Sequence, residues 1–157
     1  MVGARGSLAV TSIAGAAAVR AGLAEPIGLV GETPAFADVG LPPLADLVFG
    51  GHDVVDTPAP KRAEQLVQSG VLPAALPGAV ADDLRVADAE IRPGAERGDR
   101  APQAQTVERL AADLTSFRER HELDRVVVIN VSSTEPVAES RSEHDNLIEL
   151  RTSVQIG

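Results

Sequence analysis

The chain opens with Met1-Val2-Gly3-Ala4-Arg5-Gly6-Ser7-Leu8-Ala9, and this stretch predicts the fold more directly than any other. Gly3 and Gly6 match the second and third glycines of a G-x-G-x-x-G phosphate loop, and Met1 stands where the first glycine would be. Residues 8–21 then predict a helix rich in small side chains. Free N–H groups and the helix dipole attract anions at such a helix start, so the stretch predicts a phosphate-binding loop. A plain turn before an alanine-rich helix is the alternative interpretation.

The fingerprint normally follows a strand, but only two residues precede Gly3, so the first strand of the sheet is expected to be nearly absent. Ser7 is the expected N-cap of the first helix, and Gly22 is its expected C′ residue. Gly15 lies in the middle of that helix and predicts close packing against a neighbour.

Composition restricts the class of protein. The chain has 157 residues, which is one domain or a piece of a larger protein, and 44% of them are hydrophobic. A net charge of −9 argues against nucleic-acid binding and against anionic membranes. The absence of cysteine excludes disulfides, thiolate catalysis and Cys-ligated zinc. No apolar run reaches about 18 residues and no secretory signal is recognisable, so the expected location is the cytoplasm.

Two stretches offer an acid for the ribose of a dinucleotide. Residues 26–32 predict a short buried strand that ends in Glu32, which lies 26 residues after Gly6. In dinucleotide-binding units an acid about 20 residues past the loop holds the ribose hydroxyls, although a strand-end acid facing water fits equally well. After a loop and the apolar run 44–49, Gly50-Gly51-His52-Asp53 predicts the C-terminal edge of another strand. His52 is a base, a ligand or, by preference, a structural residue, and Asp53 can equally cap a turn.

Helices are predicted over residues 60–69, from 77 or 78 to 91, and over 106–121, with an exposed loop at 92–105. The pair Lys61-Arg62 is interpreted as part of a solvated helix face, with a phosphate contact as the alternative. The acids of the second helix are expected to face water; they are Asp82, Asp83, Asp88 and Glu90.

The β-branched run at residues 125–131 predicts a central parallel strand buried on both faces. The hydroxyl and amide groups that follow it can hydrogen-bond a cofactor, or they form a Ser/Thr-rich turn. Ser132 lacks the surroundings of a nucleophile. The predicted fold is α/β: a Rossmann-like NAD-binding domain over residues 1–139 with a parallel sheet and a truncated first strand, followed by a polar segment at 140–157 with a short helix near 143–151.

Three stretches carry a family resemblance: Val2-Gly3-Ala4-Arg5-Gly6-Ser7, Leu47-Val48-Phe49-Gly50-Gly51-His52-Asp53-Val54, and Asn130-Val131-Ser132-Ser133-Thr134-Glu135-Pro136. In this combination and order the chain resembles the bacterial branch of the inositol-3-phosphate synthase family, also called myo-inositol-1-phosphate synthase. The likeness runs to about Glu139 and weakens towards Gly157.

The resemblance implies NAD on a Rossmann-type domain and conversion of glucose 6-phosphate into inositol phosphate. In that reaction the nicotinamide oxidises the opened sugar, an intramolecular aldol step closes the ring, and the hydride is returned. It also implies a ribose contact from Asp53, in preference to Glu32. The pyrophosphate would be held by Gly3, Ala4, Arg5 and Gly6, and the nicotinamide half would be lined by Val131, Ser132, Ser133 and Thr134.

Family members take their catalytic lysines, their substrate-phosphate site and most contacts of their homo-oligomer, a tetramer, from a later domain that this sequence does not include. The chain is therefore expected to be the cofactor-binding part of a synthase, without catalytic residues or a metal site of its own and inactive alone. The alternative is a non-catalytic nucleotide-binding module or an inactive truncated fragment. A Rossmann dehydrogenase is disfavoured, because its substrate domain would be missing too.

Overall fold

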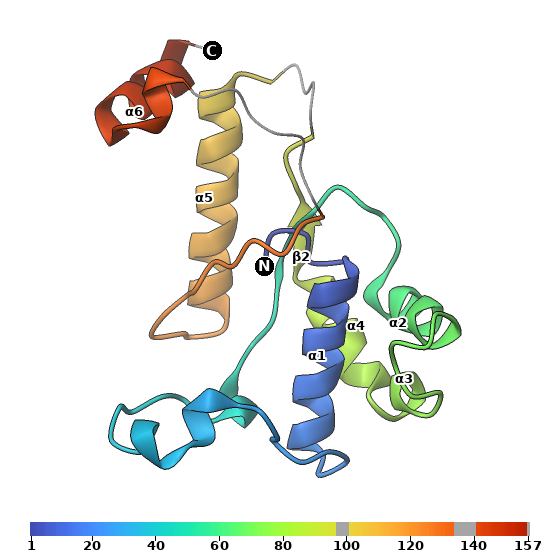
Figure 1. Cartoon of the computed structure of the whole chain (residues 1–157). Coiled ribbons are helices and arrows are strands. Elements are labelled where there is room, and N and C mark those ends of the chain that lie inside the picture. The colour runs from blue at the N-terminus through green and yellow to red at the C-terminus, as the bar shows by residue number, and fades with distance from the viewer. Residues whose placement is uncertain (97–100, 134–140, 157) are drawn as a thin grey trace.

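The computed structural model describes residues 1–96, 101–133 and 141–156, and shows a small parallel sheet between helices (Figure 1). None of the described helices is long and apolar enough to span a bilayer. The two strands are β1 (Gly51–Asp53) and β2 (Ile91–Pro93). The helices are α1 (Ser7–Arg20), α2 (Ala59–Gln68), α3 (Leu76–Ala79), α4 (Ala81–Ala89), α5 (Gln103–Arg120) and α6 (Leu147–Ile156), and 3₁₀ turns lie at Val30–Glu32, Pro34–Phe36, Leu44–Asp46 and Ser142–His144.

The sheet has the strand order expected of a doubly wound nucleotide-binding fold. β1 and β2 pair in parallel, with His52 opposite Arg92. Val2 forms parallel bridges to His52 on one side and to Asn130 on the other. The spatial order across the sheet is therefore β2, β1, Val2 and Asn130. This matches the 3-2-1-4 part of the Rossmann strand order 3-2-1-4-5-6, in which the switch point lies between strands 1 and 4, where the two halves meet. The predicted parallel α/β arrangement is confirmed.

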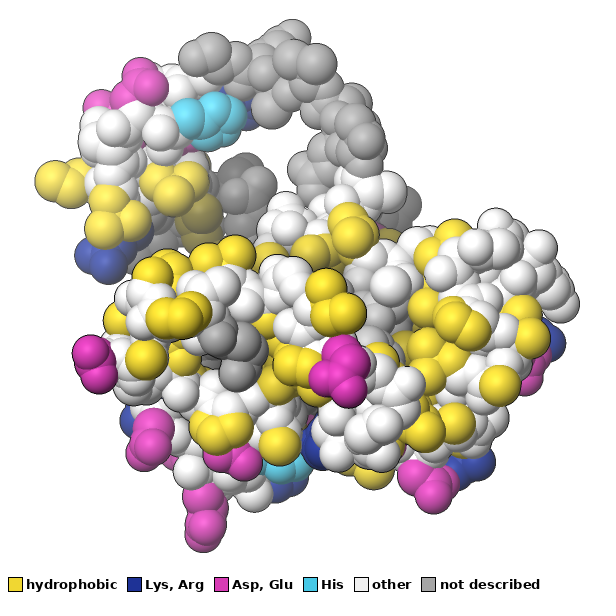
Figure 2. All heavy atoms as spheres, turned by 60° about the horizontal axis from the view of Figure 1, so that its bottom comes forward, with side chains coloured by type: hydrophobic (Ala, Val, Ile, Leu, Met, Phe, Trp, Pro, Cys, Tyr) yellow, Lys and Arg dark blue, Asp and Glu magenta, His cyan; other side chains and the backbone are white. Residues whose placement is uncertain are grey.

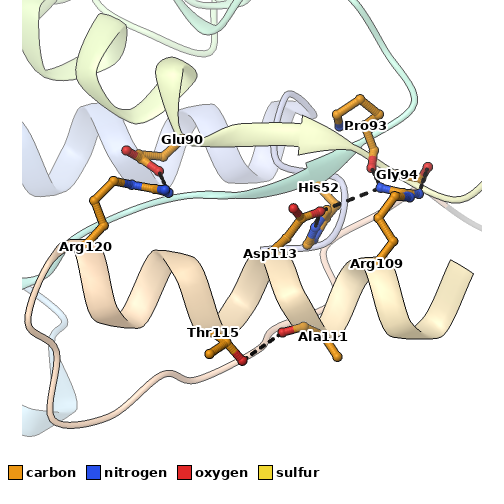
Figure 3. Close-up of polar contacts among 9 residues, drawn as sticks. All are labelled: His52, Glu90, Pro93, Gly94, Arg109, Ala111, Asp113, Thr115 and Arg120. Atoms are coloured by element: carbon orange, nitrogen blue, oxygen red, sulfur yellow. Dashed lines mark hydrogen bonds and ion pairs between the residues drawn. The ribbon is translucent and has the colours of Figure 1, made fainter. Parts of the chain in front are cut away.

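Helices α1, α2 and α4 pack together on one face of the sheet, and α5 lies against the other face (Figures 1 and 3). Alanine is frequent in the core, which lets helix backbones approach closely and compensates for the scarcity of aromatic side chains. The core residues are Val10, Ile13, Ala14, Ala17, Ala59, Ala63, Leu66, Leu72, Val80, Leu84 and Ala87.

Helix α1 ends just before the glycine that the sequence predicted as its C′ residue, Gly22. Gly22 has φ +67°, its N–H donates to the Val19 carbonyl at 3.0 Å, and the Leu23 N–H donates to the Ala18 carbonyl at 2.8 Å. These two bonds form a Schellman motif, so the prediction of Gly22 as the C′ residue is confirmed.

Two predictions about α1 are wrong. The N-cap is Gly6 and not Ser7, which is already the first helical residue. The backbone of Gly6 takes the extended conformation that a cap requires, without a side-chain cap. Gly15 does not mark close packing, because an added Cβ would have no atom of another part of the molecule within 4 Å.

The other helix predictions hold with shifted boundaries. α2 matches the helix predicted at 60–69, and α5 begins before the predicted residue 106, directly after Pro102. The single helix predicted to residue 91 is divided at Val80, whose backbone leaves the helical region (φ −116°, ψ 25°) while its side chain is buried in the core. The predicted loop at 92–105 is shorter than expected, because its first residues belong to β2 and its last residues belong to α5. Residues 97–100 lie outside the described part. The helix predicted near 143–151 lies later, as α6.

The predicted buried strand at 26–32 is wrong. Part of this segment forms the turn Val30–Glu32, and Gly28 bends the chain with φ +84°. Ile27 is 89% exposed, so burial does not stabilise an extended conformation here. Figure 2 shows hydrophobic side chains spread over the face that carries this region.

The prediction of a central strand at 125–131 is also wrong in its extent. Only Asn130 bridges to the sheet, with hydrogen bonds from the Val2 N–H to the Ile129 carbonyl and from the Val131 N–H to the Val2 carbonyl, both 2.9 Å. Val127 is 67% exposed. The physical reason is that its neighbour contributes a single residue, Val2, and a strand needs a partner of matching length to form a ladder.

Candidate functional site

The glycine loop lies at the switch point of the sheet. Gly3 follows Val2 directly, and its φ of +78° falls in the left-handed region that favours glycine. A Cβ on Gly3 would lie 2.7 Å from the Ser132 Cα and 2.8 Å from its nitrogen. The loop thus packs against the backbone that follows Asn130, and only glycine fits this approach. The structure brings together the two stretches that the sequence assigned to the pyrophosphate and to the nicotinamide half.

The N–H groups of the loop residues are used mainly to hold the loop. Gly3 and Ala4 donate to the His52 carbonyl at 2.9 and 3.2 Å, and Gly6 donates to the Gly3 carbonyl at 3.0 Å. The Arg5 N–H donates to Asp53 Oδ2 at 2.6 Å. The roles of Gly3, Ala4, Arg5 and Gly6 at a pyrophosphate therefore stay predictions.

The start of α1 offers the open amides that the sequence analysis expected at a helix start, on Ser7 and Leu8. Ser7 and Leu8 are exposed, and the first helical turn has no side-chain cap. Their N–H groups also have no carbonyl four residues earlier within the helix. An anion at the loop would meet these donors and the positive end of the helix dipole.

Asp53 is the last residue of β1, the strand next to Val2. The residue is only 9% exposed, and its carboxylate accepts two backbone N–H groups, from Arg5 at 2.6 Å and from Val55 at 2.9 Å. A carboxylate has about four acceptor positions, so capacity remains for ribose hydroxyls. Glu32 belongs to a 3₁₀ turn and not to a strand of the sheet, which favours Asp53 as the ribose candidate.

A pocket of about 240 Å³ opens beside Asp53, at the carboxyl ends of β1 and β2. Ligands of open α/β sheets bind at this edge. The pocket is polar, with three acids and one arginine among its described lining residues. These residues are Arg5, Asp53, Val54, Asp56, Ile91, Pro93, Gly94 and Glu96.

Arg5 and Asp88 form a partly buried ion pair beside the pocket. Arg5 Nε lies 2.9 Å from Asp88 Oδ1, with side chains 17% and 20% exposed, and Arg5 Nη1 donates to the Val55 carbonyl at 3.2 Å. Asp88 Oδ1 also accepts the Ala59 N–H at 2.9 Å, at the first residue of α2. Asp88 was expected to face water, and that expectation is wrong because tertiary packing supplies its partners.

Arg62 was interpreted as part of a solvated helix face, and this is also wrong. Its Nε donates to the Arg5 carbonyl at 3.1 Å, so α2 supports the glycine loop from the side. The sequence position of Arg62 is consistent with this contact, since Arg62 lies in the first turn of α2, the helix that follows Asp53. Its partner lies 57 residues away in the sequence.

His52 takes the structural role that was preferred for it. It is 8% exposed, and its Nε2 lies 3.1 Å from Asp113 Oδ2 on α5 (Figure 3). Arg109, one turn earlier on α5, donates to the Pro93 and Gly94 carbonyls at 2.8 and 3.1 Å. These contacts hold α5 to the sheet beside the carboxyl ends of β1 and β2.

Glu90 anchors the other end of α5. It was expected to face water, but its side chain is 14% exposed and lies 2.7 Å from Arg120 and 3.2 Å from His121. Burial alone would raise the pKa of the Glu90 carboxyl, but the contacts with Arg120 and His121 outweigh burial, so the pKa lies below its ordinary value.

The residues predicted to line the cofactor at the fourth strand position are partly described. Val131 is half-buried beside Val2, whereas Ser132 and Ser133 are exposed. The Ser132 N–H and Oγ both donate to Asn130 Oδ1, at 3.0 and 2.7 Å, which shapes a tight turn at the switch point. Thr134 lies outside the described residues. Within the described part of the chain, no three His, Asp or Glu side chains are placed to hold a metal ion.

Comparison with known proteins now adds to this geometry. A family model described as myo-inositol-1-phosphate synthase, an NAD-binding domain model, matches residues 1–157. The chain belongs to this family. It is also similar to inositol-3-phosphate synthase 1 of Bacteroides thetaiotaomicron, with 30% identity over 99% of the chain. The chain spans about 40% of the length of that relative. The resemblance of the sequence motifs to this family is confirmed.

Proposed function

We propose that this chain binds NAD for the conversion of glucose 6-phosphate into inositol 3-phosphate, as the cofactor-binding part of a synthase with a Rossmann-like fold. The observation that carries the proposal is the position of the glycine loop. It follows Val2 at the switch point of a 3-2-1-4 parallel order, which is where this fold binds dinucleotides. The family membership and the NAD-binding character of the family model support it.

The residues present fit the parts of NAD. The open N–H groups of Ser7 and Leu8 can receive the pyrophosphate, and Asp53 with its pocket can receive the adenosine ribose. The turn from Asn130 to Ser133 lies against Gly3, on the side where the nicotinamide half is expected. When bound, NAD accepts a hydride from the sugar and later returns it.

The residues of this chain act by binding and orienting. Asp53 positions the ribose through charge-assisted hydrogen bonds, and Gly3 keeps the loop close to Ser132 so that both sides of the switch point face one ligand. Arg62 and Asp53 hold the backbone of Arg5 from two sides, which fixes the loop before the cofactor arrives.

A non-catalytic nucleotide-binding module is the second candidate. One observation favours it, because the family resemblance implies catalytic lysines. Lys61 is the single lysine of the chain, and its Nζ is paired with Glu64 at 2.7 Å on an exposed helix face. Incubation of the purified chain with glucose 6-phosphate and NAD tests whether the chain carries catalytic groups of its own. Inositol phosphate is not expected from the chain alone, and its appearance would contradict the assignment of a purely cofactor-binding part.

Calorimetric titration of NAD into the 157-residue chain tests the proposal. Asp53→Ala and Asp53→Asn should weaken binding by about 1–3 kcal/mol, or roughly 5- to 150-fold in Kd, because charged hydrogen bonds to the ribose are lost. Asp82→Ala is the matched control, since Asp82 lies on the exposed side of α4 with a side chain 91% exposed. Folding of each variant is checked by circular dichroism. Absence of NAD binding by the folded wild-type chain would refute the proposal.

A further inference from the structure

We propose that Asp88 is a positioning residue that makes the site prefer NAD over NADP, by keeping the guanidinium of Arg5 in an ion pair. The inference rests on the proposed NAD-binding function. It extends that function by assigning the choice between the two dinucleotides to a side chain on α4, in contact with Arg5 but not among the residues that line the pocket.

The charge of the pocket is the first step of the argument. NADP differs from NAD by a phosphate on the 2′ position of the adenosine ribose. In this fold an acid binds the free hydroxyl of NAD, whereas a nearby arginine accommodates the phosphate of NADP. Here both kinds of side chain line one pocket: Asp53, Asp56 and Glu96 are acids, and Arg5 is the one cation among the described lining residues. The availability of Arg5 therefore decides whether the pocket accepts a phosphate.

The geometry of Arg5 shows that it is already paired. Its Nε lies 2.9 Å from Asp88 Oδ1 and its Nη1 donates to the Val55 carbonyl at 3.2 Å. Both side chains of the ion pair are largely shielded from water, so salt screens the pair less than a surface pair. Asp88 is itself fixed, because the same oxygen accepts the Ala59 N–H at 2.9 Å.

With Arg5 neutralised, the remaining acids of the pocket repel a 2′-phosphate. Removal of the negative charge at Asp88 should release the guanidinium, whose planar donor groups match a phosphate. Asp88→Asn is a conservative change, since an amide oxygen can still accept the Ala59 N–H at the start of α2. The variant therefore changes the charge while retaining the acceptor.

The experiment compares the Kd values of NAD and NADP for the full chain by calorimetry. The wild-type chain should bind NAD at least about tenfold more tightly than NADP, and Asp88→Asn should reduce this ratio by about fivefold or more. Asp82→Asn is the matched control, because it makes the same charge change on α4 at a side chain that is 91% exposed. Its ratio should equal that of the wild type.

A double variant separates positioning from a general loss of structure. Arg5→Ala combined with Asp88→Asn should return the ratio to the wild-type value or above, since the cation that would bind the phosphate is gone. Arg5→Ala alone should retain the NAD preference, because the paired arginine does not serve NADP. If Asp88→Asn does not fold, Asp88→Ser replaces it with the same expectation.

An unchanged ratio in folded Asp88→Asn overturns the inference, as does loss of NAD preference in Arg5→Ala. Equal binding of NAD and NADP by the wild type also overturns it, while leaving the proposed function intact. Absence of NAD binding by the wild type instead refutes the proposed function itself. The two failures are therefore distinguishable in one set of titrations.

Discussion

Replacement of Gly3 by alanine should destabilise the fold, because two independent features of the structure require glycine there. The residue has φ +78°, and an added Cβ would lie 2.7 Å from the Cα of Ser132. The atoms that would have to move belong to backbone, held by the bonds between Val2 and residues 129 and 131. A rotamer change of a side chain cannot relieve the contact.

The magnitude follows from these two costs. A left-handed backbone costs a residue with a Cβ about 1–2 kcal/mol, and overpacking against a fixed neighbour costs about 1–3 kcal/mol. The expected loss is thus about 2–5 kcal/mol, a large part of the 5–15 kcal/mol typical of a whole domain. Since the displaced segment is the one next to the proposed cofactor site, NAD binding should weaken as well.

Urea denaturation followed by circular dichroism measures this loss. Gly15→Ala is the matched control, since it is the same substitution in the same part of the chain, and no atom outside the local helix backbone lies within 4 Å of the new Cβ. It should stabilise the protein by about 0.5–1 kcal/mol through helix propensity. A Gly3→Ala variant within about 0.5 kcal/mol of the wild type, the range of ordinary surface substitutions, would refute the reasoning.

Two further predictions concern the attachment of α5. The lowered pKa of Glu90 means that its ionised form stabilises the folded state at and above the ordinary pKa of 4.5, and this contribution is lost as the pH falls through the folded-state value. Wild type should therefore exceed Glu90→Gln in unfolding free energy at neutral pH and converge with it at strongly acidic pH, and parallel pH profiles would contradict this. Asp113→Ala should cost about 1–3 kcal/mol by leaving His52 buried without its partner. Glu108→Ala, an exposed change on the same helix, should cost less than about 0.5 kcal/mol, and equal losses in the two variants would count against the contact.

Local signals in the sequence predicted the existence of most helices, and the C-terminal ends of α1 and α2. The glycines after α1 and α2 both have positive φ, +67° at Gly22 and +72° at Gly70, as the helix-end pattern requires. The strands were predicted poorly, because an apolar run becomes a strand only where a partner is available. Residues 26–32 and 125–131 have the composition of strands, whereas β1 contains Gly51, whose Cβ would overlap the Met1 carbonyl.

The residues of the candidate site were predicted from the sequence, but their contact partners were not. The glycine loop, Asp53 and the stretch after Asn130 were identified from the sequence, through spacing and family resemblance. The residues that hydrogen-bond or form ion pairs with them were not identified from the sequence. The side chains of Asp88, Arg62 and Glu90 were all expected to face water, because helical periodicity does not show which polar side chains another element covers.

The sequence by itself determined that the chain contains a glycine loop before a helix, an alternation of helices with β-branched segments, and the motifs of its family. These features depend on backbone preferences and residue types over a few neighbouring positions. Only the tertiary structure decided the strand order across Val2, the burial of Asp53 beneath Arg5, and the ion pair of Arg5 with Asp88 across 83 residues. The physical reason is that hydrogen bonds and ion pairs act over a few ångströms in space, and folding alone brings such distant residues to that distance.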